Sequence, residues 1–339
     1  MFIVENYAMA VVLCFITMLC WGSWGNTQKL AAKTWRYELY YWDYVIGMVL
    51  FALLIGFTFG SIGSEGRHFV DDLAQSSLWA LGSVILGGII FNASNILLSA
   101  SVSLAGMAVA FPLGVGIALV LGVIINYIGA PKGDAVTLFA GVALVVIAII
   151  CNGIASGRIG SSSADGDSAS QRRKGLWLAI CAGVLMAFFY RFVAAAMDLN
   201  DFQHPAPGML TPYSALFIFS IGVLLSNFVF NTIAMRRPFV GETVSYSQYF
   251  KGSFSTHMVG ILGGAIWCLG TACSYIAAGK AGAAISYALG QGAPMIAAIW
   301  GVFIWKEFKG ADKRTNLLLA LMFLFFIAGL GLIILSGGN

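Results

Sequence analysis

The chain has 339 residues, of which 60% are hydrophobic and only 9% are charged, and its mean hydropathy is +0.89. Soluble domains carry roughly 25% charged residues, so this composition excludes a soluble globular protein and predicts a chain that crosses a lipid bilayer many times. The formal net charge of +4 comes from basic residues spread over short loops, which excludes a patch suited to nucleic acid.

Apolar segments of about 20 residues, the length that spans a bilayer, recur along the whole chain. In order, the predicted spans are residues 7–28, 39–60, 78–101, 107–129, 135–155, 176–197, 211–234, 257–278, 283–304 and 316–336. No basic stretch precedes the first span, which we expect to be retained rather than cleaved as a signal peptide. The predicted fold class is an all-α polytopic membrane protein with ten transmembrane helices.

The longest polar interruption, residues 156–174, is rich in Ser, Gly and Asp and leaves five spans on each side. The expected organisation is therefore a first five-helix unit over residues 1–155, a linker over 156–174 and a second five-helix unit over 175–339.

Lysine and arginine are concentrated in alternate loops. The loops after the first, fifth, seventh and ninth spans hold fourteen of them: Lys29, Lys33, Arg36, Arg158, Arg172, Arg173, Lys174, Arg236, Arg237, Lys251, Lys306, Lys309, Lys313 and Arg314. The other loops hold only Arg67, Lys132 and Lys280. Because cytoplasmic loops retain positive charge, the linker is predicted to be cytoplasmic and both termini to be outside.

Five spans per half mean that the two halves enter the membrane in opposite directions. Similarity between them would then indicate an inverted repeat of the kind found in secondary transporters. Residues 86–116 align without gaps with residues 262–292, at an offset of 176. Gly88 falls on Gly264, and Phe91 falls opposite Trp267. An inverted duplication is expected, and the alternative is a chance match of two Gly-rich apolar segments.

Polar groups inside spans are costly unless they face a cavity or one another, which makes them candidates for binding a solute. The candidates are Trp21, Trp24, Asn92, Asn95, Trp267, Thr271, Tyr287 and Gln291. Aromatic rings beside amide and hydroxyl groups suit a small, ring-shaped, neutral solute. Packing of the tryptophans, and hydrogen bonds between helices for the asparagines, are the alternatives.

Two formal charges are expected inside the spans. Asp43, in YELYYWDYVIG near the cytoplasmic start of the second span, either forms a structural ion pair with Lys29 or Arg36 or carries a coupling proton. Arg191, in the sixth span, either extends to the interface, pairs with Asp198, or attracts a partly negative solute.

The remaining chemistry-bearing residues suggest no enzyme. The six cysteines lie in apolar segments without metal-ligand spacing, so that neither disulfides nor a metal site are predicted. His257 is expected at the membrane interface rather than in a proton relay. No protease motif or paired-carboxylate arrangement is found inside the spans, and no cofactor is expected.

Three stretches, CWGSWGNTQKL, YYWDYVIGMVL and GGIIFNASNILLSAS, resemble the drug/metabolite transporter superfamily. Within it the chain is similar to bacterial relatives of the ureide permeases, close to the glucose/ribose porter branch. Asp43 and Asn95 are the most specific matches, and the resemblance is strongest over residues 7–155. It implies two inverted five-helix repeats and a secondary carrier for a small neutral polar solute, either a ureide or nucleobase or a monosaccharide such as ribose.

The resulting hypothesis is an importer of the cell inner (plasma) membrane that works by alternating access and is coupled to protons. Residues 156–174 contain no GxxxxGK[ST] motif, so ATP dependence is not expected. The oligomeric state is left open between a monomer and a homodimer. The alternative is a metabolite or multidrug exporter, because a shared fold fixes neither direction nor substrate.

Overall fold

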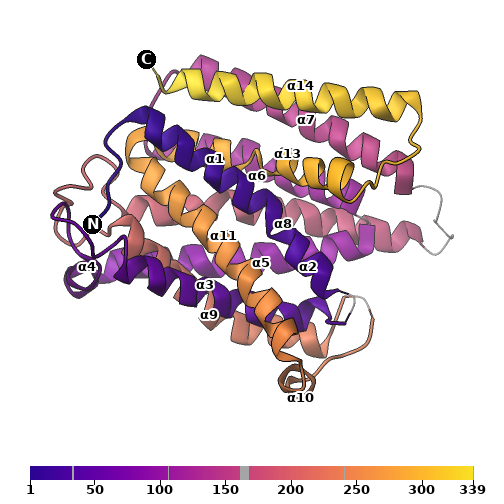
Figure 1. The fold of residues 1–339 in the computed structure, drawn as a ribbon, viewed down its shortest axis with the longest axis horizontal. Helices are drawn as coiled ribbons and strands as arrows, with labels where there is room; N and C mark the ends of the chain where they lie inside the picture. The colour runs from indigo at the N-terminus through magenta and orange to yellow at the C-terminus, as the bar shows by residue number, and fades with distance from the viewer. Residues whose placement is uncertain (33, 106, 161–167, 240, 339) are drawn as a thin grey trace.

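A computed structural model describes residues 1–32, 34–105, 107–160, 168–239 and 241–338. These residues are almost entirely helical (Figure 1), and ten segments are long and apolar enough to cross a membrane. The predicted all-helical class and the number of spans are therefore confirmed. Among the described residues there is no β-strand, only an isolated bridge between Met197 and Leu210.

Eight spans are single helices, and two are interrupted. The single helices are α3 (Tyr37–Phe57), α5 (Leu78–Ala105), α6 (Met107–Gly129), α7 (Ala135–Gly160), α8 (Ser168–Ala196), α9 (Pro212–Arg236), α11 (Phe254–Ala281) and α14 (Lys313–Ser336). The first span consists of α1 (Tyr7–Ser23) and α2 (Gly25–Ala31). The ninth consists of α12 (Ala283–Gly290), α13 (Ala293–Ile299) and a π-helical turn, η2 (Trp300–Ile304).

The break in the ninth span has a local cause. Pro294 lies in the first turn of α13, where a missing backbone N–H removes no helical hydrogen bond. Gly292 and Gln291 form the connection between α12 and α13. Such interruptions are tolerated at membrane depth where the backbone is covered by protein or faces a cavity.

The packing of the helices has the same pattern in both halves. Helix α5 packs against α8 and α9, and α11 likewise packs against α1 and α3. Helix α6 packs against α8, and the broken ninth span packs against α1. Three further pairs, α3 with α9, α6 with α12 and α7 with α14, join corresponding spans of the two halves. Each of these contacts thus has a counterpart when the halves are exchanged.

Glycines allow two of these pairs to approach closely. A methyl group at Gly264 on α11 would overlap the carbonyl oxygen of Tyr44 on α3, and one at Gly88 on α5 would overlap the carbonyl oxygen of Phe219 on α9. Close backbone approach is what small residues provide where lipid gives no hydrophobic drive for helices to pack. The two glycines are the ones aligned at the offset of 176.

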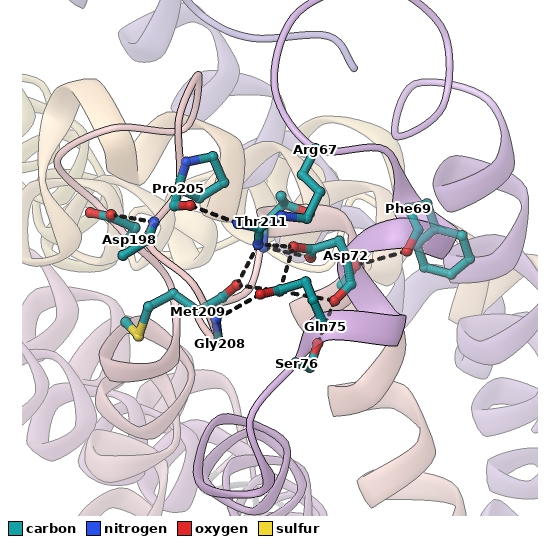
Figure 2. A network of polar contacts seen from close by, with 12 residues as sticks. Arg67, Phe69, Asp72, Gln75, Ser76, Asp198, Pro205, Gly208, Met209 and Thr211 are labelled. Carbon is teal, nitrogen blue, oxygen red and sulfur yellow. Dashed lines mark hydrogen bonds and ion pairs between the residues drawn. The ribbon is translucent and has the colours of Figure 1, made fainter.

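At the end of the molecule where both termini lie, the short helix α4 (Phe69–Gln75) is fastened to the segment before α9 (Figures 1 and 2). The buried Asp72 carboxylate accepts hydrogen bonds from Arg67 Nη1 at 2.9 Å and from the Thr211 backbone N–H at 2.8 Å. The Gln75 amide donates to Met209 O at 3.0 Å and accepts from Gly208 N at 2.6 Å. Charge-assisted bonds to a buried carboxylate are strong, so α4 is held firmly against the segment before α9.

The loops with most basic residues lie together at the opposite end (Figure 1). Lys29 pairs with Glu307, and Arg158 Nη2 lies 2.7 Å from Asp312 Oδ2. Arg36 donates to the Glu242 carbonyl oxygen. These contacts join the loops that follow the first, fifth, seventh and ninth spans.

Candidate functional site

A cavity of ≈ 110 Å³ lies among the helices of both halves. It is lined by Trp21, Trp24, Phe91, Ser94, Asn95, Leu98, Gly114, Val115, Ala118, Ala182, Gly183, Met186, Phe189, Trp267, Gln291, Ala293 and Pro294. Both interrupted spans contribute at their breaks. None of these lining residues carries a formal charge, and the described part of the chain has no cluster of three His, Cys, Asp or Glu side chains that could hold a metal ion.

Aromatic rings form one wall of the cavity. Trp21 and Trp267 are stacked, with ring centroids 5.9 Å apart and planes inclined by 11°, and Phe91 lies 4.5 Å from Trp267. Trp21 Nε1 donates to Thr271 Oγ1 at 3.2 Å, which fixes the indole in its plane. These flat faces would pack against a flat ring.

Polar groups on the wall are few. The side chains of Asn95 and Gln291 contribute amides, and the Ser94 hydroxyl is already bonded to the Ala182 carbonyl oxygen at 2.7 Å. Asn95 Nδ2 donates to the Tyr41 hydroxyl at 3.1 Å, so the position of this amide is set from behind the wall. A mostly apolar cavity with few oriented polar groups is typical of sites for small molecules.

A layer of aromatic residues separates the cavity from the end that carries the termini. Tyr190, Tyr275 and Tyr287 are fully buried, and the Tyr190 ring lies 5.4 Å from Tyr275 and 5.3 Å from Tyr287. The Tyr190 hydroxyl is 2.9 Å from Ser274 Oγ. These three rings therefore form a packed layer between the cavity and that end.

Five of the eight residues predicted to bind solute line the cavity: Trp21, Trp24, Asn95, Trp267 and Gln291. The other three lie behind it.

Asn92 bridges helices, accepting from the Tyr41 hydroxyl at 2.9 Å and donating to Ser226 Oγ at 2.9 Å. Thr271 supports Trp21, as described above. The Tyr287 hydroxyl donates to the Ala118 carbonyl oxygen at 3.1 Å and so ties α12 to α6.

One wall of the cavity was missed by sequence reasoning. Helix α8 contributes Ala182, Gly183, Met186 and Phe189. None of these residue types is unusual in a membrane helix, so the sequence contains no signal that marks them. Only the packing of α8 against α5 and α6 brings them to the cavity.

Asp43 lies outside the cavity and is buried, with 1% of its surface exposed. Its Oδ1 accepts from the Tyr249 hydroxyl at 2.6 Å, and His257 Nδ1 lies 2.8 Å from Oδ1 and 3.0 Å from Oδ2. Burial, followed by the hydrogen bond to Asp43, raises the pKa of Tyr249 above its ordinary value, so the phenol keeps its proton and remains the donor.

Neither partner is one of the two basic residues, Lys29 and Arg36, that the sequence offered as ion-pair partners of Asp43. Lys29 pairs with Glu307 and Arg36 with Glu38, so the alternative of an ion pair between Asp43 and either base is wrong. The physical reason is that Asp43 points toward the start of α11 and the short helix α10 (Tyr246–Phe250), whereas Lys29 on α2 and Arg36 at the start of α3 have carboxylate partners of their own. His257 was expected only to lie at the membrane interface. In the structure it is also a direct partner of Asp43.

Arg191 also lies away from the cavity. Its guanidinium lies against Gly129 at the end of α6. Asp198 accepts instead from the backbone N–H groups of Asn200 at 3.3 Å and Ala206 at 3.0 Å. Of the three roles considered, this geometry agrees with a side chain that extends toward the interface.

A ten-span helical fold around an uncharged cavity, lined by helices of both halves, is typical of a multi-pass membrane transporter. The family model described as Ureide permease matches residues 40–174 and 164–336. The chain therefore belongs to the ureide permease family, whose members are membrane transporters rather than enzymes.

The relatives cover all or nearly all of the chain. Ureide permease 2 of Arabidopsis thaliana is 25% identical over the full length of both proteins. Probable ureide permease A3 of Vigna unguiculata is 24% identical over 92% of this chain and 99% of that protein. A solved crystal structure superposes with a TM-score of 0.59 over 96% of both chains at 14% identity, which shows a shared fold.

Proposed function

We propose that this transporter imports a small, neutral, ring-shaped polar solute of the ureide or nucleobase type, with a monosaccharide such as ribose as the other class to be tested. The observation that carries the proposal is the uncharged cavity of ≈ 110 Å³ with the stacked pair Trp21 and Trp267 on one wall and the Asn95 and Gln291 amides beside it. The relatives named above are ureide permeases, which favours the first class.

The size of the cavity argues against a multidrug exporter. Sites for drug-sized ligands occupy ~300–1,000 Å³, several times the volume observed. Efflux of hydrophobic cations would also favour an acidic wall, whereas the lining residues are uncharged. A compact ring with a few hydrogen-bonding groups suits this space.

Alternating access would follow from an inverted duplication, with repeats over residues 1–155 and 175–339 joined by a linker over 156–174. Two aligned pairs support it, because both members of each line the cavity: Phe91 with Trp267, and Val115 with Gln291. A site on the axis between two repeats can open to either side as one repeat tilts against the other.

Asp43 is the candidate for proton coupling. It is a buried carboxylate with a titratable neighbour, His257, and a phenol donor, Tyr249. The next residue on α3, Tyr44, lies 4.9 Å from the cavity residue Trp24. A change of protonation that shifts α3 would thus reach the cavity wall. Charge in the basic loops supports placing the Asp43 end in the cytoplasm and both termini outside, as expected for the inner (plasma) membrane.

The test is transport by the purified full-length protein in liposomes, with labelled allantoin, uracil and ribose, with and without an imposed proton gradient. Accumulation of allantoin or uracil that depends on the gradient is the expected result. Uptake of ribose alone would move the protein to the sugar class, and uptake of none of the three would contradict the proposal.

A further inference from the structure

Behind the cavity wall, four polar side chains of α5, α3 and α9 form an unbroken series of hydrogen bonds. Asn95 Nδ2 donates to the Tyr41 hydroxyl at 3.1 Å, and that hydroxyl donates to Asn92 Oδ1 at 2.9 Å. Asn92 Nδ2 then donates to Ser226 Oγ at 2.9 Å. Tyr41 and Asn92 are fully buried, and only Asn95 lines the cavity.

The direction of this series is fixed at its far end. Ser226 Oγ donates its one proton to the backbone carbonyls of its own helix, Gly222 O at 2.8 Å and Val223 O at 3.0 Å. Asn92 Nδ2 also lies 3.3 Å from Val223 O. A carbonyl oxygen can only accept, so the amide nitrogen of Asn92 must face α9 and its Oδ1 must face Tyr41.

The same reasoning carries through to the cavity. A phenol has one proton to donate, and Tyr41 gives it to Asn92. The Tyr41 oxygen can then only accept, which turns Asn95 Nδ2 toward it. The carbonyl oxygen Oδ1 of Asn95 is thereby left for the cavity.

We infer that this series, defined by Asn95, Tyr41, Asn92 and Ser226, is a specificity device that presents an acceptor to the solute. It selects a solute with an N–H donor at that point, as the ring N–H groups of a ureide or nucleobase provide, and discriminates against one that offers an acceptor or a methyl group there. In a mostly apolar cavity a buried acceptor left without a donor is costly, so the discrimination is steep. The inference rests on the proposed function, because it concerns the same cavity.

The role of Tyr41 is to position Asn95 rather than to touch the solute. With Tyr41→Phe, the Asn95 amide loses the partner that orients it, and either its oxygen or its nitrogen can face the solute. The variant should therefore lose selectivity for N–H groups more than it loses binding itself.

The experiment measures binding of uracil, 1-methyluracil and 3-methyluracil to the full-length protein in lipid nanodiscs, by quenching of tryptophan fluorescence. In the wild type, one of the two methyl derivatives should bind about tenfold or more weakly than uracil. We define the ratio as the affinity for uracil divided by the affinity for the weaker-binding methyl derivative, and in Tyr41→Phe it should fall by about threefold or more. The methyl group has the same bulk in both proteins, so a change in this ratio reports the hydrogen bond between the solute N–H and Asn95 Oδ1.

Tyr40→Phe is the matched control, since the Tyr40 hydroxyl bonds Thr27 Oγ1 at 2.8 Å and takes no part in the series; its ratio should equal that of the wild type. Ser226→Ala is a second control, because the Val223 carbonyl oxygen, 3.3 Å from Asn92 Nδ2, still orients the Asn92 amide; its ratio should stay near that of the wild type. An unchanged ratio in folded Tyr41→Phe protein would overturn the inference. A wild type that binds neither uracil nor allantoin would instead overturn the proposed function.

Discussion

Two asparagines one helical turn apart, Asn92 and Asn95, have different tasks. Both lie on the face of α5 that meets α3, but only Asn95 reaches the cavity. Asn92 is fully buried and has partners on both α3 and α9. Exchange of either amide for a hydrophobic residue would leave buried partners unpaired, at a cost of about 1–3 kcal/mol for each, so loss of binding alone does not identify the solute contact.

Asp43 illustrates how a carboxylate inside a helix bundle is paired. Its carboxylate has two side-chain partners, Tyr249 and His257, and buried charges persist where they are paired and hydrogen-bonded. The His257 side chain is 23% exposed, so under the proposed topology this cluster has contact with the cytoplasmic side.

Replacement of Asp43 by Asn is expected to abolish accumulation while exchange of solute across the membrane continues. One coupled proton and a gradient of one pH unit support at most about tenfold accumulation, and the variant should show none. Accumulation and counterflow in liposomes measure the two activities separately.

The control is Glu307→Gln, which also converts a carboxylate to an amide but does so in the surface pair with Lys29. This variant should behave as the wild type. Accumulation by Asp43→Asn at the wild-type level would make the role of Asp43 structural.

Among the helices, the closest contacts are made at glycines, where the backbone of one helix meets the backbone or a side chain of the next. Helix α11 presents Gly260, Gly263 and Gly264 to α2 and α3, where a methyl group would meet Asp43, Tyr40 or Tyr44. Close approach of this kind lets α11 bring Trp267 to the cavity and His257 to Asp43 on one rigid element. Both proposed functions of the protein, solute binding and proton coupling, therefore depend on the same pair of helices.

Substitution Gly264→Ala is expected to destabilise the protein by about 1–3 kcal/mol, because the added methyl group overlaps the Tyr44 carbonyl oxygen and forces α3 and α11 apart. Thermal unfolding of the detergent-purified protein measures the change. Gly82→Ala on α5 is the control, since a methyl group there has nothing within 4 Å and alanine favours the helix. Equal unfolding temperatures for the two variants would show that the α3–α11 contact tolerates separation.

The whole molecule has two unlike ends. The end with both termini is capped by α4 and the Arg67–Asp72 ion pair (Figure 2), and the aromatic layer around Tyr190 lies between that end and the cavity. The other end carries the basic loops and the Asp43 cluster. Under the proposed topology, the aromatic layer lies between the cavity and the outside.

Labelling of single introduced cysteines tests this topology. Ser64, between α3 and α4, and Lys309, before α14, are both exposed at opposite ends of the molecule. In intact cells a membrane-impermeant maleimide should label Ser64→Cys, whereas Lys309→Cys should be labelled only after permeabilisation. The wild type, with its six cysteines in the spans, gives the background. The opposite labelling pattern would contradict the proposed topology, because the end with the basic loops and Asp43 would then face the outside.

The sequence by itself determined the class and the ten spans in order. The reason is physical: hydrophobic length and helix-forming composition are local properties, and the bilayer imposes a length that each span must meet. The ninth span was predicted as one span for the same reason, because its hydrophobic length is a local property. Its breaks at Gln291 and Trp300 were not predicted.

Only the tertiary structure decided which polar residues face the cavity. A polar group in a membrane helix is satisfied equally well by a solute, a cavity or another helix, so composition cannot separate Asn95 from Asn92 or reveal the wall formed by Ala182 and Gly183. The partner of Asp43 was hidden for the same reason, because His257 lies 214 residues away along the chain. Such pairings depend on how helices pack, which is a property of the whole fold.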